Sequence, residues 1–199
     1  MMDIALIDAG GANFGSVIHA LDRLGHSPRR VRDADALGDP DRIILPGVGE
    51  AAGAMRLLRE RGLVDALRDA TAPTMGICLG MQLLFEHSEE GDVECLGLMS
   101  GRVRKLQPGQ GIRVPHMGWN VLNTMADSPL LSGVEAGAQA YFVHSYAVPV
   151  NSTCIARTTH GSDFAAIVQQ DHRCGAQFHP EKSSKVGERV LGNFLRWAP

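Results

Sequence analysis

The first 80 residues alternate short strand-like runs with segments of helical periodicity. The pattern predicts strands at residues 3–8, 29–32, 42–45 and 71–78. The spacing of apolar positions predicts helices at 16–24 and about 54–61, with Gly25 ending the first and Gly62 interrupting the second. A further apolar run at 79–87 is also predicted to be helical. A strand–helix series of this kind is typical of a largely parallel sheet.

Residues after about 95 follow a different pattern, with shorter segments separated by turns. Strands are predicted at 94–99, 102–106, 112–119, 140–148, 153–159, 163–168 and 173–179, and a last helix at 185–197. We expect this half to be largely antiparallel. No internal repeat or low-complexity linker divides the chain. The sequence therefore predicts one α/β domain over residues 1–199, with an open, largely parallel central sheet flanked by helices and antiparallel strands in its C-terminal half.

The composition of the 199 residues, 44% hydrophobic and 21% charged, is that of a globular protein. Lys and Arg number 19 against 22 Asp and Glu, so there is no cationic excess for a nucleic-acid partner. The first residues lack the basic region of a signal peptide, and no apolar run reaches the roughly 20 residues that cross a bilayer. We expect a cytoplasmic protein that binds neither nucleic acid nor membrane.

The four cysteines lie far apart, without a CxxC pair. This spacing argues against a zinc site, and a reducing compartment argues against disulfides. Cys95, Cys154 and Cys174 are therefore expected to be small buried hydrophobic residues.

Cys78 stands in the sequence Gly76-Ile77-Cys78-Leu79-Gly80, after a predicted strand and before a predicted helix. This is the G-x-nucleophile-x-G form of a nucleophile elbow, with cysteine in place of serine. The small residues allow a tight turn, and the N-terminus of the helix directs free N–H groups toward the sulfur, which favours the thiolate. The alternative is a buried cysteine beside incidental glycines.

A cysteine nucleophile needs a base, and the base needs a group that orients it. His179-Pro180-Glu181 supplies both. On an extended segment residues i and i+2 share a face, so Glu181 can hold one imidazole nitrogen while the other faces the cleft. We expect the preceding strand to lie beside the strand that ends at Cys78. A surface turn is the alternative for these three residues.

An anionic tetrahedral intermediate also needs hydrogen-bond donors. The backbone N–H of Leu79 is one candidate, because it directly follows the nucleophile. The N–H of Val48 is a second candidate, because Gly47 and Gly49 allow that peptide to turn toward the cleft. An ordinary strand-to-helix turn is the alternative at this position.

Two other kinds of site are only weakly indicated. The loop from Gly10 to Gly15 has Asn13 where a dinucleotide fingerprint needs glycine, and no P-loop motif occurs. The scattered histidines have no recognisable metal-ligand spacing: His116, His144, His160, His172 and His179. We expect neither a metal nor a cofactor.

Three segments together resemble the class I, triad-type glutamine amidotransferases: GICLGMQLL around Cys78, LPGVG around Gly47 and QFHPEKS around His179. PHMGWN at 115–120 and YFVHSY at 141–146 further resemble the glutaminase subunits of imidazole glycerol phosphate synthases, over nearly the whole chain. The resemblance implies a flavodoxin-like amidotransferase fold. It implies Cys78 as nucleophile, His179 as general base and acid, and Glu181 as orienting carboxylate. It also implies a glutamine site that includes Gly47, Gly49, Gln82, Glu90, Ser145 and Tyr146.

The same resemblance implies a heterodimer, in which ammonia passes to a (β/α)8 cyclase subunit of histidine biosynthesis. The expected docking residues are Asn13, His116, Met117 and Trp119. Three residues of the nearby loop depart from the family pattern, namely Ala9, Gly11 and Ala12, and they bear on contact detail rather than on the triad.

Two other functions use some of the same features. A cysteine peptidase or acyl hydrolase needs the same elbow and His-x-Glu pair, and release of ammonia from free glutamine distinguishes the amidotransferase from it. A non-catalytic module that keeps the fold is the second alternative, but it has no need of Cys78, His179 and Glu181 together.

Overall fold

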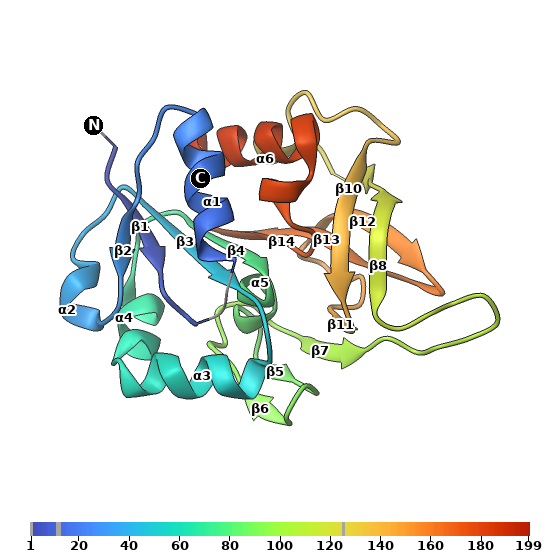
Figure 1. Ribbon diagram of the computed structural model, residues 1–199, viewed down its shortest axis with the longest axis horizontal. Coiled ribbons are helices and arrows are strands. Elements are labelled where there is room, and N and C mark those ends of the chain that lie inside the picture. The colour runs from blue at the N-terminus through green and yellow to red at the C-terminus, as the bar shows by residue number, and fades with distance from the viewer. Residues whose placement is uncertain (1, 11–12, 125) are drawn as a thin grey trace.

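An eight-stranded sheet forms the centre of the computed structural model, which describes residues 2–10, 13–124 and 126–199 (Figure 1). Gly11 and Ala12, two of the departures from the family pattern, lie outside the described residues. The strand order is β2-β1-β3-β4-β14-β13-β12-β9. The bounds are β1 (Ile4–Ile7), β2 (Arg29–Val31), β3 (Arg42–Gly47), β4 (Thr74–Cys78), β9 (Asn123–Thr124), β12 (Cys154–His160), β13 (Ser162–Gln170) and β14 (Arg173–Ala176).

The sheet divides into a parallel and an antiparallel half, as the sequence predicted. β2, β1, β3, β4 and β14 run parallel, and β13, β12 and β9 continue the sheet in antiparallel pairs. β14 lies beside β4, with Gly175 opposite Gly76 and Ala176 opposite Ile77. The expected neighbour of the cysteine strand is therefore confirmed, and the carboxyl ends of β3, β4 and β14 meet at one edge.

Helices cover both faces of the sheet (Figure 1). The helices are α1 (Phe14–Arg23), α2 (Ala34–Leu37), α3 (Ala51–Glu60), α4 (Leu63–Asp69), α5 (Leu79–Leu83) and α6 (Ser184–Arg196), with short 3₁₀ turns at Pro129–Leu131 and Pro180–Lys182. In β1, Ile4 and Leu6 join the apolar core under α1 and α6, whereas Ala5 and Ile7 join the core under α3, α4 and α5. This alternation is the period of two that a strand imposes. No helix within the described ranges is long and apolar enough to span a bilayer.

Two smaller sheets complete the fold. β8 (His116–Val121) pairs with β10 (Gln139–His144), and β5 (His87–Ser88), β6 (Val93–Glu94), β7 (Arg102–Lys105) and β11 (Tyr146–Ala147) form the other. The strand expected at 140–148 is thus divided at Ser145. At this break Ser145 O accepts the N–H of Leu106, and the side chain of His144 contacts Tyr146 O through Nδ1. The strand expected from residue 112 begins at His116.

The helix predicted at 79–87 and the strand predicted at 94–99 are wrong in large part. α5 ends at Leu83, and β6 covers only Val93–Glu94. Beyond α5, the carbonyls of residues 83–85 accept N–H groups from residues 96–99, at 2.8–2.9 Å. Because these carbonyls pair with residues 96–99, the buried apolar run after Leu83 does not continue α5.

Other boundaries moved for local reasons. α3 begins at Ala51, earlier than expected, and the break at Gly62 is confirmed, since that residue has φ +68° between α3 and α4. α2 was not predicted, and its N-terminus is capped by the Asp33 side chain, which accepts the N–H of Ala36 at 2.9 Å. β14 ends at Ala176, three residues before the expected end.

Two glycine substitutions test how much of this fold depends on close backbone approach. A Cβ at Gly80 lies 1.8 Å from Leu45 O, whereas a Cβ at Gly53, inside α3, meets no atom within 4 Å. We expect Gly80→Ala to lower the free energy of unfolding by about 3 kcal/mol or more. Gly53→Ala, the matched control, should raise it by about 0.5–1 kcal/mol, because alanine is the better helix former. Urea unfolding measures both, and equal effects of the two substitutions contradict the steric argument.

Candidate active site

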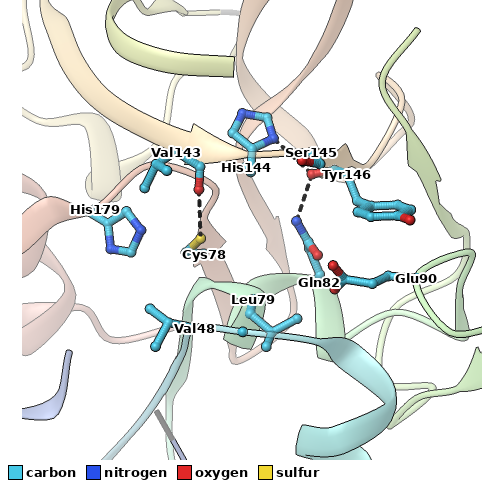
Figure 2. Close-up of a pocket in the computed structure, with 11 residues that line it drawn as sticks. Val48, Cys78, Leu79, Gln82, Glu90, Val143, His144, Ser145, Tyr146 and His179 are labelled. Carbon is cyan, nitrogen blue, oxygen red and sulfur yellow. Dashed lines mark hydrogen bonds between the residues drawn. The ribbon is translucent and has the colours of Figure 1, made fainter. Parts of the chain in front are cut away.

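A pocket of about 200 Å³ opens at the carboxyl ends of β3 and β4, beside the turn between β10 and β11 (Figure 2). Open α/β sheets place their ligand sites at this edge. Nine of the residues singled out in the sequence line this one pocket, from segments up to 131 positions apart: Val48, Gly49, Cys78, Leu79, Gln82, Glu90, Ser145, Tyr146 and His179. Val143 and His144 also line it, and neither was assigned there from the sequence.

Cys78 stands at the turn from β4 into α5 with a backbone conformation that side chains rarely adopt, φ +54° and ψ −111°. The flanking glycines make this turn possible. A Cβ at Gly76 lies 2.6 Å from Gly80 O, and a Cβ at Gly80 overlaps the backbone of β3. The turn holds the sulfur in the pocket, where Cys78 Sγ donates to Val143 O at 3.8 Å (Figure 2). This geometry is that of a nucleophile elbow.

His179 and Glu181 form a buried pair next to Cys78. His179 Nδ1 lies 2.7 Å from Glu181 Oε1, and because a carboxylate only accepts, Nδ1 carries the proton. His179 Nε2 is buried and has no hydrogen-bond partner among the described residues. The pair is thus oriented as a base and its carboxylate, with one ring nitrogen available toward the pocket.

The route to this pair differs from the expected one. Residues 179–181 are not extended, because Pro180–Lys182 forms a 3₁₀ turn. The turn is held by Ser183, whose hydroxyl donates to His179 O at 2.7 Å, and the N–H of His179 donates to Tyr141 O of β10. The i, i+2 argument is therefore wrong, although the contact that it predicted is present.

Two neighbours control the charge of the imidazole. Burial lowers the pKa of His179, but Cys78 and Glu181 both raise it and outweigh burial, to about 9. In the free chain at neutral pH, the imidazole therefore carries a proton on both ring nitrogens, next to the sulfur and the carboxylate.

Asn13 and Gln177 contact the triad side chains, and the sequence did not point to either contact. Asn13 Nδ2 donates a short hydrogen bond to Glu181 Oε1 and lies 3.2 Å from His179 Nδ1. Gln177 is fully buried, and its Nε2 donates to Cys78 Sγ at 3.8 Å. The sequence signal for Gln177 was its position alone, two residues before His179.

The expected glutamine-binding residues form the far wall of the pocket (Figure 2). Gln82 Nε2 donates to Tyr146 O at 2.7 Å and to Gln177 Oε1 at 3.0 Å. Glu90 Oε2 accepts the N–H of Ala51 at 3.0 Å. Burial raises the pKa of Glu90, and that hydrogen bond opposes the shift. A carboxylate at this wall can hold an ammonium group, and Gln82 is itself held in place by two bonds.

Val48 and Leu79, the two expected oxyanion donors, both line the pocket and lie below Cys78 in the view of Figure 2. The two glycines that flank Val48 are not equivalent. Gly47 pairs with Cys78 in the sheet, and a Cβ there lies 2.7 Å from Gly80 N, so this residue permits close packing of β3 on α5. Gly49 has φ +104° and open space around it. Backbone freedom in this loop is therefore concentrated at Gly49.

The four expected docking residues separate into exposed and inward-facing side chains. Met117 and Trp119, both on β8, are 64% and 53% exposed, which excludes a core tryptophan. His116 is 4% exposed, because alternate residues of a strand point to opposite faces. Its inclusion among surface contacts is corrected. Asn13 is half-buried against Glu181.

The scattered histidines do not gather into a metal site. Across the described ranges, no group of three or more His, Cys, Asp or Glu side chains is placed to hold a metal ion. His116 stacks on His160 at 4.1 Å, and His172 contacts Ala70 O. Cys95, Cys154 and Cys174 are buried, as expected.

The fold has close counterparts among solved structures. A structure described as a glutamine amidotransferase superposes with a TM-score of 0.77 at 22% identity, covering 97% of each chain. The PurLQS structure from Thermotoga maritima gives a TM-score of 0.72 at 24% identity, covering 98% of this chain and 99% of that one. These likenesses confirm the predicted fold class.

Sequence comparison is more specific. The chain is 61% identical over 195 residues to the imidazole glycerol phosphate synthase subunit HisH of Xanthomonas axonopodis pv. citri (strain 306), covering 98% of both chains. HisH of Xylella fastidiosa (strain Temecula1) has the same identity and coverage. The profile of the family "Glutamine amidotransferase class-I" matches residues 5–197. The motifs around Cys78, Val48 and His179 thus identified the family correctly, and the chain belongs to the class I glutamine amidotransferases.

Proposed function

We propose that this chain is the glutaminase subunit of an imidazole glycerol phosphate synthase, which hydrolyses the side-chain amide of glutamine and delivers the ammonia to a cyclase partner in histidine biosynthesis. The observation that carries the proposal is the His179–Glu181 pair, bonded at 2.7 Å beside Cys78 in one pocket of a chain 61% identical to HisH. We further propose that residues 1–199 act as one amidotransferase domain, which the family profile over 5–197 supports, and we expect it to work in the cytoplasm.

The reaction begins with attack of Cys78 Sγ on the amide carbon of glutamine. The sulfur forms a C–S bond, and the carbonyl oxygen becomes an oxyanion that the N–H groups of Val48 and Leu79 stabilise. His179 Nε2 then gives its proton to the leaving nitrogen, the C–N bond breaks and ammonia departs. Water, deprotonated by His179, hydrolyses the γ-glutamyl thioester to glutamate and restores Cys78.

The far wall of the pocket holds the substrate. Glu90 receives the α-ammonium group, and the segment Ser145 to Tyr146 lies along the rest of the glutamine chain. Gln82, fixed by Tyr146 O and Gln177, supports this wall. Gly49 lines the opposite side of the pocket without a side chain, whereas Gly47 supports that side only by packing against Leu79 and Gly80.

Ammonia must reach the cyclase before water protonates it, so the two active sites must be joined by docking. Met117 and Trp119 are the large exposed apolar side chains of the described chain, and we propose that they anchor the partner. Rotation of the Val48 peptide at Gly49 would then switch the oxyanion donor. One missing donor costs about 10²- to 10³-fold in kcat, so the isolated subunit is nearly inactive.

Replacement of the nucleophile tests the chemistry. Cys78→Ser should abolish glutaminase activity, because the hydroxyl is a far weaker nucleophile, while ammonium salts still support product formation by the complex. Cys174→Ala is the matched control: burial raises the pKa of that thiol, and its loss costs about 1–2 kcal/mol of packing. Ammonia release and product formation are measured separately. Glutamine turnover retained in Cys78→Ser refutes the assignment.

Glu181→Gln tests the electrostatics of the pair. It removes one of the two groups that raise the pKa of His179, so that pKa should fall below about 9. A folded pKa above the ordinary value of about 6.5 adds stability below pH 6.5, and this stability is lost as pH rises to 9. The variant should therefore lose less unfolding free energy between pH 6.5 and 9 than the wild type does.

Urea unfolding at the two pH values measures this difference, with Glu60→Gln, exposed on α3, as the control. His179→Asn should cost about 10²- to 10⁴-fold in kcat, and Glu181→Gln less. A wild-type pH dependence together with full activity in Glu181→Gln removes the carboxylate from the mechanism.

Trp119→Ala tests the docking face. We expect affinity for the cyclase to fall by about 2 kcal/mol or more, with the fold intact, because the indole is exposed in the free chain. Asp39→Ala is the control: it is exposed in the turn before β3, at the opposite edge of the sheet. Titration of each variant with the cyclase gives the affinity and the stimulated glutaminase rate. If the free chain matches the rate of the complex, the gating proposal is wrong.

A further inference from the structure

A hydrogen-bonded network of polar side chains runs from the wall of the pocket to strand β8. His144 Nδ1 lies 2.8 Å from Tyr146 O, and His144 Nε2 lies 3.0 Å from His116 Nδ1. His116 Nε2 lies 3.2 Å from Asn120 Nδ2. The pocket strand β10 and the outer strand β8 are thus joined by side chains as well as by their backbone ladder.

The groups at the two ends of this network fix the direction of every hydrogen bond in it. Tyr146 O can only accept, so His144 Nδ1 donates and His144 Nε2 is left as an acceptor. At the other end, Asn120 Oδ1 accepts the N–H of Val121 at 2.8 Å, and Asn120 Nδ2 donates to Thr159 O at 2.9 Å. Its amide is therefore oriented with the NH₂ group toward His116.

Only one protonation state satisfies both ends. His116 must donate from Nδ1 to His144 and accept at Nε2 from Asn120. Both imidazoles are then neutral and both carry their proton on Nδ1. A second proton on either ring would place two donors face to face in a buried site, which costs the desolvation of an unpaired group.

The surroundings of the rings favour the same state. Burial, together with the nearby His160, lowers the pKa of His116 to about 4. Burial lowers the pKa of His144 to about 3, although the bond to Tyr146 O opposes this shift. Phe142 stacks on His116 at 5.0 Å, and Phe164 meets His144 edge-on at 4.9 Å.

On the pocket side, the hydrogen-bonded network continues as far as Cys78. Tyr146 O accepts Gln82 Nε2 in addition to His144, and Gln82 is bonded to Gln177, whose amide donates to Cys78 Sγ. The position of one carbonyl, Tyr146 O, therefore depends on His144 and His116, and the position of Gln82 depends on that carbonyl (Figure 2).

We propose that His144 and His116 are positioning residues of the glutaminase, which hold Tyr146 O and Gln82 in place and connect the pocket to strand β8. This inference rests on the proposed function, because the pocket that they position is the proposed glutamine site. The rings do not touch the reacting atoms. Their contribution is the fixed sequence of donors and acceptors between Asn120 and Gln82.

Nuclear magnetic resonance of the wild-type protein labelled with ¹⁵N-histidine tests the protonation state directly, and variants are needed only to assign the signals. At pH 7 we expect two neutral imidazoles protonated at Nδ1, assigned to His144 and His116 by their loss in His144→Asn and His116→Phe. Their Nδ1 protons should exchange slowly with solvent. A charged ring, or a proton on Nε2 of either residue, overturns the proposal.

A crossed pair of variants separates hydrogen bonding from ring packing. His116→Phe keeps a ring between Phe142 and His160 but loses both bonds, whereas His116→Asn loses the ring and keeps a donor near the Nδ1 position. With saturating cyclase, we expect the KM for glutamine to rise about 3- to 10-fold in His116→Phe, the value of one net hydrogen bond, and kcat to change less. The KM for glutamine of His116→Asn should lie close to the wild-type value.

The reverse order, with His116→Phe normal and His116→Asn impaired, shows that the ring acts by packing and overturns the proposal. Unchanged KM in His116→Phe does the same. Urea unfolding of both variants establishes that each is folded when assayed. Failure of the proposed function is distinguishable, because the wild-type complex itself then releases no ammonia from glutamine.

Discussion

The structure depends on the close approach of α5 to strand β3, at the turn that carries Cys78. Three positions around this turn, on β3, β4 and α5, have no room for a Cβ: Gly47 against Gly80 N, Gly76 against Gly80 O, and Gly80 against Leu45 O. Without side chains at these positions, the chain turns directly from a buried strand into a helix and holds Cys78 at φ +54°. The sulfur is thereby presented at the sheet edge by backbone packing, and no side chain needs to position it.

The rest of the site is assembled around that turn from neighbouring strands. β3 brings Val48 to one side of Cys78, and β14 leads to Gln177 and His179 on the other. Backbone bonds place His179, through its own N–H to β10 and through the 3₁₀ turn that follows, and Glu181 orients its ring. Rigid elements therefore supply the geometry, and the charges of the buried pair supply the reactivity.

Local patterns predicted what local forces determine. The alternation of strands and helices, the glycine-flanked cysteine and the break at Gly62 were readable because each depends on residues within a few positions. The end of α5 was not, because the carbonyls of 83–85 are taken by residues 96–99. His116 was misplaced for a related reason, since the register of β8 decides which residues of the segment 115–120 face outward. In a strand that exposes Trp119, the alternation of side chains places His116 on the opposite, buried face.

Two segments that carry the proposed docking residues are hydrogen-bonded to the site, one to Glu181 and the other to the pocket wall. Asn13, at the start of α1, shares Glu181 Oε1 with His179, and β8, which exposes Met117 and Trp119, is bonded through His116 and His144 to the pocket wall. A buried donor that loses its acceptor costs about 1–3 kcal/mol, enough to change a population many-fold. Under the proposed docking, a small displacement of either segment by the partner is enough to bias the site, because hydrogen bonds already connect both segments to it.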